Sequence, residues 1–322
     1  MKAVGLELAD AGSGKIAASL RLFLPPDPAI TLDFTRPVPN ATPEISKPSQ
    51  SPIYDPAAAK AFFEAAGTTE DAAPGKTFFV ERQQKSFFSS DDHMYLLLEG
   101  AVGLTVGGKS IDTVKPGEVF GEMATITNSS RSATATAKSA CRVIALNGSQ
   151  FQKAIQKTPA FALMLMGIMI NRLRLTLARV TMQNAIPDSL PGNERRVFDE
   201  KTLDAITDEL GNPALMRYMP EQTIISAGEP GVLMYMPREG RVAIVADGRT
   251  LEHVGVGGVF GEMALVDRST RVADAICETE CALLAVNRQQ LIELVQSKPA
   301  FGLSLLKLLA QRLQAVTNPA PK

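Results

Sequence analysis

The five residues Phe-Gly-Glu-Met-Ala occupy positions 120–124 and occur again at positions 260–264. At the same offset, without a gap, 18 of the 44 residues from 94 to 137 are identical to those from 234 to 277. Average residue usage would give roughly one identity in sixteen pairs by chance. The chain therefore contains two copies of one domain, each large enough to have its own core.

The repeat divides the chain into two domains with further segments around them. The 322 residues are enough for two domains of roughly 100–200 residues each. Residues 1–57 have no counterpart in the repeat and are dense in proline from residue 25 onward, which predicts a mostly irregular arm with one strand near residues 30–34. The predicted bounds are 58–184 for copy one, 185–197 for a linker rich in helix-breaking residues, 198–317 for copy two and 318–322 for a tail.

Composition and charge argue against several classes of protein. Lys and Arg number 33 and Asp and Glu 34, so the net charge is −1, unlike a strongly basic nucleic-acid-binding chain or a polybasic membrane-surface protein. Three cysteines in so long a chain indicate no disulfide framework. The first residues lack the apolar stretch of a signal peptide, and the most apolar run, residues 159–170, is shorter than the ~20 residues of a membrane span. We therefore expect a cytoplasmic protein without a membrane span.

Within each copy the pattern changes from strands to helices. In copy one, short runs separated by glycine turns predict strands over residues 94–98, 101–106, 111–114, 133–137 and 141–146. A helical period begins after Asn147, and after Asn287 in copy two. The helix that follows Thr158-Pro159 has a wide apolar face, which we expect to pack against the barrel, the other copy or a second subunit. The predicted fold class is α+β, with two tandem β jelly-roll barrels and flanking α-helices.

Each Phe-Gly-Glu-Met-Ala motif is followed by an arginine nine residues after its glutamate, which pairs Glu122 with Arg131 and Glu262 with Arg271. Small residues crowd both stretches and let a ligand approach the main chain closely. A helical turn that begins at the glutamate would direct free N–H groups at an anion, and the arginine fork suits a phosphate. A carboxylate accepts hydrogen bonds from hydroxyls such as those of a ribose. One anion together with one sugar hydroxyl indicates a bound nucleotide.

On these residues the chain resembles the cyclic-nucleotide-binding domain family, which includes the bacterial catabolite activator protein and the regulatory subunits of cyclic-AMP-dependent kinase. The motif followed by Arg-x-Ala is similar to that family's phosphate-binding cassette, and the resemblance spans both copies. It implies an eight-stranded jelly roll followed by hinge and cap helices. It also implies that Arg131 and Arg271 hold the cyclic phosphate, and Glu122 and Glu262 the ribose 2′-hydroxyl. The other ligand-binding residues expected from it are Gly121, Met123, Ala124, Ser132 and Ala133 in copy one, and Gly261, Met263, Ala264, Val272 and Ala273 in copy two.

Two positions depart from the family pattern. Ser130 and Thr270 stand where family members often have a proline before the arginine. After the arginine, Ser132 can add a hydrogen bond to the phosphate or base, whereas Val272 cannot. We therefore expect cyclic AMP as the ligand, with copy two as the more cyclic-AMP-like site and cyclic GMP as a second candidate in copy one. By resemblance the base is contacted from the helix after the barrel, where the candidates are Thr176 and Thr317.

Simpler interpretations of these motifs stay open. Each glutamate could form a structural ion pair with the arginine nine residues later, and copy one could be a degenerate site. The Gly12–Lys15 segment matches a phosphate loop only in part. Two histidines are too few for a usual jelly-roll metal site, so we expect no metal. The cysteines at 141, 277 and 281 and the methionines at 164, 166 and 169 are expected in the core or an interface.

No nucleophile–base pair is apparent, so we expect no enzyme activity. The sequence predicts a cyclic-nucleotide sensor that moves its helices and controls an unidentified partner protein. Direct DNA binding is not expected, because only residues 318–322 follow the last predicted helix, and the helix at residues 160–180 offers a homodimer surface. The arm lacks the Arg-Arg-x-Ser pattern of a kinase inhibitor, although a kinase partner stays open. The alternative is a constitutive interaction scaffold with vestigial pockets.

Overall fold

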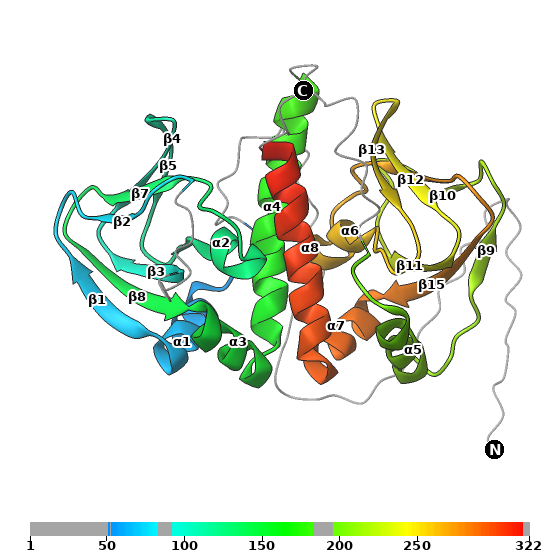
Figure 1. Ribbon diagram of the computed structural model, residues 1–322, viewed down its shortest axis with the longest axis horizontal. Coiled ribbons are helices and arrows are strands. Elements are labelled where there is room, and N and C mark those ends of the chain that lie inside the picture. Colours follow the sequence, from blue (N-terminus) through cyan, green and yellow to red (C-terminus); the bar gives the residue numbers. More distant parts are fainter. Residues whose placement is uncertain (1–50, 52, 83–91, 183–195, 318–322) are drawn as a thin grey trace, which may run out of the picture. The chain divides into compact units, whose positions relative to one another are not determined.

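Each half of the chain folds as strands first and helices last, as the repeat predicts (Figure 1). The computed structural model describes residue 51 and residues 53–82, 92–182 and 196–317, all of which belong to one unit, Ile45–Lys322. Nearly all of the arm, with its strand near residues 30–34 and its Gly12–Lys15 segment, lies outside the described residues, as do most of the linker and the tail. We call the half that starts at Pro56 domain A and the half after the linker domain B.

Domain A contains two antiparallel four-stranded sheets, with strand orders β1-β8-β3-β6 and β2-β7-β4-β5. This arrangement confirms the predicted jelly roll with flanking helices. Its elements are α1 (Pro56–Ala66), β1 (Thr68–Ala72), β2 (Thr77–Phe79), β3 (His93–Glu99), β4 (Val102–Val106), β5 (Lys109–Val114), β6 (Val119–Phe120), α2 (Glu122–Thr127), β7 (Thr134–Ala137), β8 (Cys141–Asn147), α3 (Gly148–Lys157) and α4 (Ala160–Met182).

Domain B repeats this plan with sheets ordered β11-β15-β9 and β10-β14-β12-β13. An isolated bridge between Tyr235 and Phe260 replaces the pairing that β6 makes in domain A, so the described part of domain B has seven strands where domain A has eight. Its elements are α5 (Glu200–Glu209), β9 (Met216–Tyr218), β10 (Thr223–Ile225), β11 (Leu233–Glu239), β12 (Val242–Ala246), β13 (Arg249–Val254), α6 (Glu262–Asp267), β14 (Asp274–Cys277), β15 (Cys281–Asn287), α7 (Arg288–Ser297) and α8 (Pro299–Thr317).

The change from strand to helix is fixed by the asparagines that the sequence singled out. Asn147 and Asn287 are the N-caps of α3 and α7, and each forms a capping box with the glutamine three residues later. Such a box satisfies two main-chain N–H groups that the first helical turn leaves free. At the start of domain A, Asp55 caps α1, which therefore begins at Pro56, two residues before the predicted bound.

The tight turns between β3 and β4 in domain A and between β11 and β12 in domain B both require glycine. Gly100 and Gly240 have φ angles of 91° and 82°, which side chains rarely allow. A Cβ atom at these positions would lie 2.3 Å from the carbonyl oxygen of Ala140 and 2.2 Å from that of Glu280. The same backbone contact is therefore built twice, and it confirms the turn expected at Glu99-Gly100.

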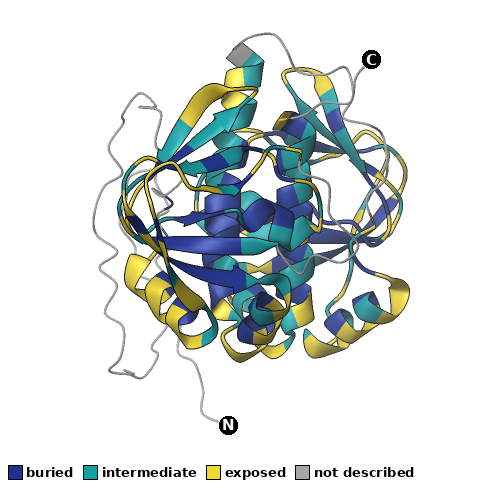
Figure 2. Ribbon diagram, turned by 60° about the vertical axis from the view of Figure 1, so that its left-hand side comes forward, coloured by how far each residue is buried: buried dark blue, intermediate teal, exposed yellow. Residues whose placement is uncertain are grey.

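Three hydrophobic clusters organise the interior. Two of them fill the barrels, one in each domain. The third joins the helices of both domains and forms the dark central layer in Figure 2. Met164, Met166 and Met169 belong to this shared cluster, as expected for core methionines. The three cysteines are buried and free, and burial raises the pKa of Cys277 to about 12, so its thiol stays protonated.

Helices α4 and α8 pack side by side at the centre of Figure 1. By length and composition alone, α4 could cross a membrane, since residues 160–181 have a mean hydropathy of 1.5 over their most apolar window. However, 56% of that window is buried within the protein, as for a core helix. The apolar face on which we expected a homodimer meets α8 of the same chain, and homodimerisation stays a prediction.

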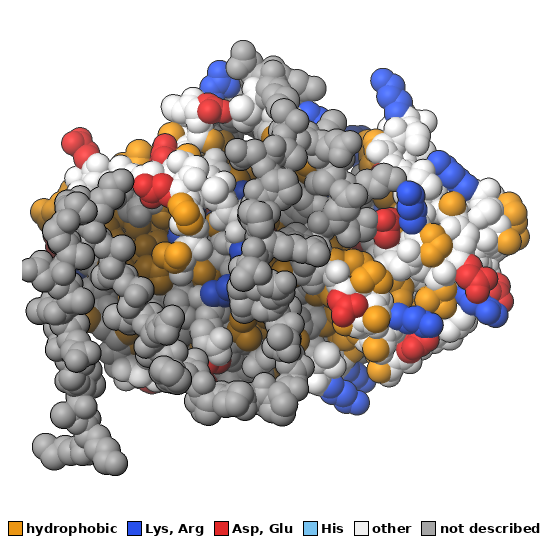
Figure 3. Space-filling model, turned by 180° about the vertical axis from the view of Figure 1, so that it is seen from behind, with side chains coloured by type: hydrophobic (Ala, Val, Ile, Leu, Met, Phe, Trp, Pro, Cys, Tyr) orange, Lys and Arg blue, Asp and Glu red, His pale blue; other side chains and the backbone are white. Residues whose placement is uncertain are grey.

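The described surface carries charges of both signs. On the face in Figure 3, basic and acidic side chains are interspersed over the part of the protein that is not grey. This distribution agrees with the net charge of −1.

Candidate functional site

The two Phe-Gly-Glu-Met-Ala motifs form equivalent loops, which we call loop A (residues 121–131) and loop B (residues 261–271). Each loop starts with a glycine of positive φ, 76° at Gly121 and 81° at Gly261, and continues into a short helix that begins at the glutamate. This confirms the predicted helical turn. A Cβ atom on Gly121 would lie 3.1 Å from Nη1 of Arg131, and one on Gly261 would lie 2.9 Å from Nη1 of Arg271. The glycines thus leave room for the guanidinium groups.

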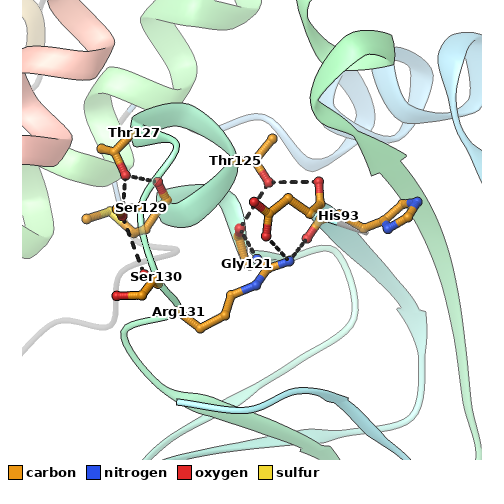
Figure 4. Close-up of polar contacts among 9 residues, drawn as sticks. His93, Gly121, Thr125, Thr127, Ser129, Ser130 and Arg131 are labelled. Carbon is orange, nitrogen blue, oxygen red and sulfur yellow. Dashed lines mark hydrogen bonds and ion pairs between the residues drawn. The ribbon is translucent and has the colours of Figure 1, made fainter. Parts of the chain in front are cut away.

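Arg131 lies across the start of loop A with its guanidinium buried (Figure 4). Its Nη1 donates to the carbonyl oxygen of Gly121 at 2.8 Å, and its Nη2 donates to that of His93 at 2.9 Å. The Asp92 carboxylate is 3.5 Å from Nη2, and the Phe79 ring lies under the guanidinium with its centroid 4.3 Å from Cζ. The arginine is thus held firmly in place.

Arg271 repeats this geometry in domain B. Its Nη1 donates to Gly261 and its Nη2 to Leu233, both at 2.6 Å to the carbonyl oxygen. Leu233 is the repeat equivalent of His93. These two hydrogen bonds use two of the five N–H donors of the guanidinium, which leaves donors for a ligand.

Both guanidinium groups are poorly solvated and charged, which favours the binding of an anion. Burial lowers the pKa of Arg131 and of Arg271 from the ordinary value, because the charged form is poorly solvated there. Nearby Asp92, Tyr95 and Glu122 act in the opposite direction on Arg131. A guanidinium has too high a pKa to lose its proton at neutral pH, so its charge stays and favours an anionic ligand.

The buried glutamates are paired with arginines of the long helices. Arg172 of α4 donates from Nη1 to Glu122, and Arg312 of α8 donates from Nη1 to Glu262 at 2.8 Å. The structural ion pair considered between each glutamate and the arginine nine residues later is therefore not the pairing found in the described residues. Our sequence reasoning missed Arg172 and Arg312, although they match at the repeat offset.

Arg312 is held at three points. Its Nε donates to Glu252 at 2.8 Å, its Nη1 to Glu262, and its Nη2 to the carbonyl oxygen of Val259 at 2.7 Å. Burial alone would lower the pKa of Arg312, but Glu252 and Glu262 outweigh burial and raise it above the ordinary value. Each glutamate uses one carboxylate oxygen in these bonds, so the other can accept a hydroxyl.

A cavity lies at loop B, between the barrel and the two long helices. Arg271, Glu262 and Arg312 all line it. Thr317 is exposed and does not line it, whereas its neighbour Val316 does. The predicted residues that line this cavity are Gly261, Glu262, Met263, Ala264, Arg271, Val272 and Ala273.

In domain A the predicted residues cluster around loop A. Met123, Ala124 and Ala133 are buried, and Ser132 is exposed. Thr176 donates its hydroxyl hydrogen to the carbonyl oxygen of Arg172 on its own helix, as Thr317 does to Leu313. The proposed base contacts of both threonines stay predictions.

The arrangement offers an anion site beside a hydroxyl acceptor in each domain. Within the described residues, no group of three or more His, Cys, Asp or Glu side chains could hold a metal ion. A buried guanidinium can bind an anion, and a nearby carboxylate can accept a hydrogen bond from a hydroxyl of the same ligand.

The sequence profile of the cyclic nucleotide-binding domain matches residues 88–158 and 215–298, which include both loops. The chain carries two cyclic nucleotide-binding domains. Domain A and domain B are thus two copies of one such domain, as the resemblance implied.

Relatives of these domains occur in kinase signalling proteins. The chain is 23% identical over 204 residues to a cGMP-dependent protein kinase of Toxoplasma gondii, covering 62% of this chain and 18% of the kinase. It is 26% identical over 184 residues to a cAMP-dependent protein kinase regulatory subunit of Colletotrichum orbiculare, covering 56% of this chain and 41% of the subunit. Among solved structures, cAMP-bound PfPKA-R (141–441) is 21% identical with a TM-score of 0.29, covering 75% of this chain and 78% of that one. The chain spans less than half the length of these two curated relatives.

Proposed function

We propose that the chain is a cyclic-nucleotide sensor that binds one nucleotide at loop A and one at loop B and reports binding through α4 and α8. The observation that carries this proposal is the buried guanidinium of Arg271, which lines a cavity next to the carboxylate of Glu262. In domain A, Arg131 and Glu122 are likewise buried, and Arg131 donates to the carbonyl oxygen of Gly121 at the start of loop A. Arg131 and Arg271 bind the cyclic phosphate, and Glu122 and Glu262 accept the ribose 2′-hydroxyl.

The arginines supply most of the affinity. A charge-assisted hydrogen bond contributes about 1.5–3 kcal/mol, whereas a neutral one contributes about 1 kcal/mol. Because each guanidinium is desolvated and held by two carbonyl oxygens, it is already in position before the ligand arrives.

The glutamate of each site links the ligand to a long helix. The carboxylate that accepts the ribose hydroxyl also holds Arg172 of α4 in domain A, or Arg312 of α8 in domain B. A ligand shifts an equilibrium only if it binds one state better, and a change in this carboxylate's bonds gives the helix such a difference. Binding therefore alters the position of α4 or α8 and what these helices present to a partner protein.

Cyclic AMP is the proposed ligand of both sites, with cyclic GMP as the second candidate in domain A, where Ser132 adds a hydroxyl that Val272 lacks. The relatives described above include both a cGMP-dependent kinase and a regulatory subunit of a cAMP-dependent kinase. The regulated partner is an unidentified protein in the cytoplasm, and the chain itself acts as a binding protein without enzyme activity and without direct DNA contact.

Titration calorimetry with cyclic AMP and cyclic GMP tests this function. The wild-type chain is expected to bind two nucleotides, and the variants Arg131→Leu and Arg271→Leu one each. Each lost site should weaken by about tenfold to 150-fold, as expected for a charge-assisted bond.

Exposed arginines provide matched controls, namely Arg142→Leu in domain A and Arg217→Leu in domain B. They remove the same charge at surface ion pairs and should leave both affinities unchanged. No binding heat from either nucleotide, with a folded chain by circular dichroism, would favour the constitutive scaffold instead.

A further inference from the structure

Positions 174 and 314 are equivalent in the repeat, and each reaches the loop of the other domain. Arg174 of α4 in domain A contacts Asp267 of loop B, and Gln314 of α8 in domain B contacts Thr127 of loop A. Asp267 and Thr127 are themselves equivalent positions of the repeat. The two contacts are thus the same junction built twice with different chemistry.

The junction at loop B is an ion pair. Nε of Arg174 donates to Oδ2 of Asp267 at 2.6 Å, and Nη2 donates to Oδ1 at 3.2 Å. The side chains are only 20% and 9% exposed, so water screens the pair weakly. The same carboxylate accepts hydrogen bonds from the main-chain N–H and the hydroxyl of Ser269, at 3.1 and 2.5 Å. Asp267 therefore joins two parts of loop B, through its bonds with Ser269, and also joins the loop to helix α4 of the other domain.

The junction at loop A is neutral. Nε2 of Gln314 donates to the hydroxyl oxygens of Thr127 at 3.2 Å and Ser129 at 2.6 Å. Hydrogen bonds between neutral groups are roughly half as strong as bidentate charged ones. Loop B is therefore held more firmly by domain A than loop A is held by domain B.

Helix α4 also closes the cavity at loop B. Leu173, Arg174 and Leu177 line this cavity together with Arg271 and Glu262. The Arg174 charge is close enough to Arg271 to act with burial in lowering the pKa of Arg271. Domain A thus supplies part of the pocket that opens in domain B.

One helix connects the two sites. We call the proposed ligand sites at loop A and loop B site A and site B. Arg172, which holds Glu122 of site A, and Arg174, which holds Asp267 of loop B, are two residues apart on α4. A movement of α4 that changes the first ion pair must therefore act on the second. This continuity is the physical route by which one site could bias the other.

We propose that the Arg174–Asp267 ion pair is a latch that positions loop B for its ligand and couples nucleotide binding at the two sites. The proposal rests on the proposed function, because the ligand at each loop is a cyclic nucleotide. Arg174 acts here as a positioning residue through Asp267. The Gln314 contact is the weaker counterpart, so most of the coupling runs through α4.

The test compares Arg174→Gln, which places the residue of α8 at the equivalent position of α4, with Arg179→Gln. Arg179 is an exposed arginine of the same helix, and no ion pair is found for it within the described residues. Cyclic AMP titrations of the full chain are made with site A intact and with site A disabled by Arg131→Leu. The ratio of the two site B affinities gives the coupling factor, which is reciprocal between the sites.

We expect a coupling factor of about fivefold or more in the wild-type chain and close to one in Arg174→Gln. In the Arg131→Leu background, Arg174→Gln should weaken site B by about three- to tenfold, Arg174→Lys should restore part of the affinity, and Arg179→Gln should change nothing. A merely structural role of Arg174 would lower thermal stability and leave the coupling factor unchanged. Unchanged affinity and coupling in Arg174→Gln would overturn the proposal.

Amide hydrogen exchange of the nucleotide-free chain separates this proposal from the proposed function. Arg174→Gln should speed exchange in residues 263–270 and not in loop A, while Arg179→Gln should have no effect. If cyclic nucleotides do not bind the wild-type chain, the sensor function is wrong and the coupling is wrong with it, yet faster exchange confined to loop B would still identify the latch. Unchanged exchange in loop B would reject the latch even in a chain that binds two nucleotides.

Discussion

Domain A and domain B share a backbone plan but hold their functional loops by different contacts. Glu122 of domain A is paired with Arg172 alone in the described residues, and Arg172 is 23% exposed. In domain B, Arg312 is 11% exposed and joins Glu262 to a second carboxylate, Glu252. The equivalent of Glu252 in domain A is the shorter Asp112, which accepts a hydrogen bond from the next main-chain N–H.

The two domains share the arginine and the glutamate of the motif, whereas the contacts that hold these residues differ. The charged network is denser in domain B, where the loop meets two long helices through arginines. In domain A, neutral hydroxyl and amide groups replace part of it. We therefore expect site B to be the more rigid of the two sites and site A to be the more flexible.

The largest expected effect separates the two helix arginines. Arg312→Ala leaves the buried Glu262 and the partly buried Glu252 without their cation and should cost about 3–5 kcal/mol of unfolding free energy. Arg172→Ala should cost less, about 1–3 kcal/mol, because Arg172 is more exposed and has one partner. Urea denaturation measures both, with Arg179→Ala as a control that should stay within about 0.5 kcal/mol of wild type. Equal losses in the two variants would contradict the difference between the domains.

The next prediction concerns a feature in which the domains should behave alike. Gly100→Ala and Gly240→Ala each press a Cβ atom onto a carbonyl oxygen in a strained backbone, so each should cost about 2–4 kcal/mol. Gly107→Ala and Gly248→Ala, which have positive φ but open space, should cost only about 1 kcal/mol. The same denaturation experiment measures all four. A large difference between Gly100→Ala and Gly240→Ala would show that the two barrels are not equivalent.

The next prediction gives loop A the ion pair of loop B and measures the effect on ligand binding. The double variant Thr127→Asp with Gln314→Arg would give loop A the ion pair that loop B has. Because a charged pair is stronger than neutral hydrogen bonds, cyclic AMP should bind site A about two- to fivefold more tightly. Calorimetry in the Arg271→Leu background isolates that site. Weaker or unchanged binding would show that the ion pair does not organise the loop.

The smallest effect is a difference in alkaline stability. Cys277 of domain B replaces Ala137 of domain A, and burial raises the pKa of its thiol from 9.0 to about 12. The folded state therefore favours the neutral thiol, so its contribution is fully present below pH 9 and declines between pH 9 and 12. Cys277→Ala should remove this decline, as seen in urea midpoints measured below pH 9 and between pH 9 and 12. The same decline in both proteins would assign it to another group.

The sequence predicted those parts of the molecule that local pattern determines. The repeat, the strand-to-helix order, the caps at Asn147 and Asn287, and the helical turns after Gly121 and Gly261 all depend on residues close together in the chain. Because the offset between the copies is constant, each interpretation made for one copy applied to the equivalent residues of the other.

Contacts between distant segments were not predictable in this way. Arg172 and Arg312 match in the repeat, but their partners lie 50 residues earlier and depend on how each helix folds back onto its barrel. Arg174 and Gln314 differ from each other, so the repeat gave no signal for the junctions between domains. The sequence did not indicate that Val316, the neighbour of Thr317, lines the cavity at loop B, because which residues of α8 face that cavity depends on how α8 packs against α4.

The single cluster of apolar side chains that joins both domains ties their folding together. Met166 and Met169 of α4 and Leu305 and Leu309 of α8 are fully enclosed members of that one cluster. A chain severed in the linker would therefore leave two halves, each with a long apolar helix face exposed to water. Neither half has a polar surface on that face, so we expect each to aggregate when it is separated from the other.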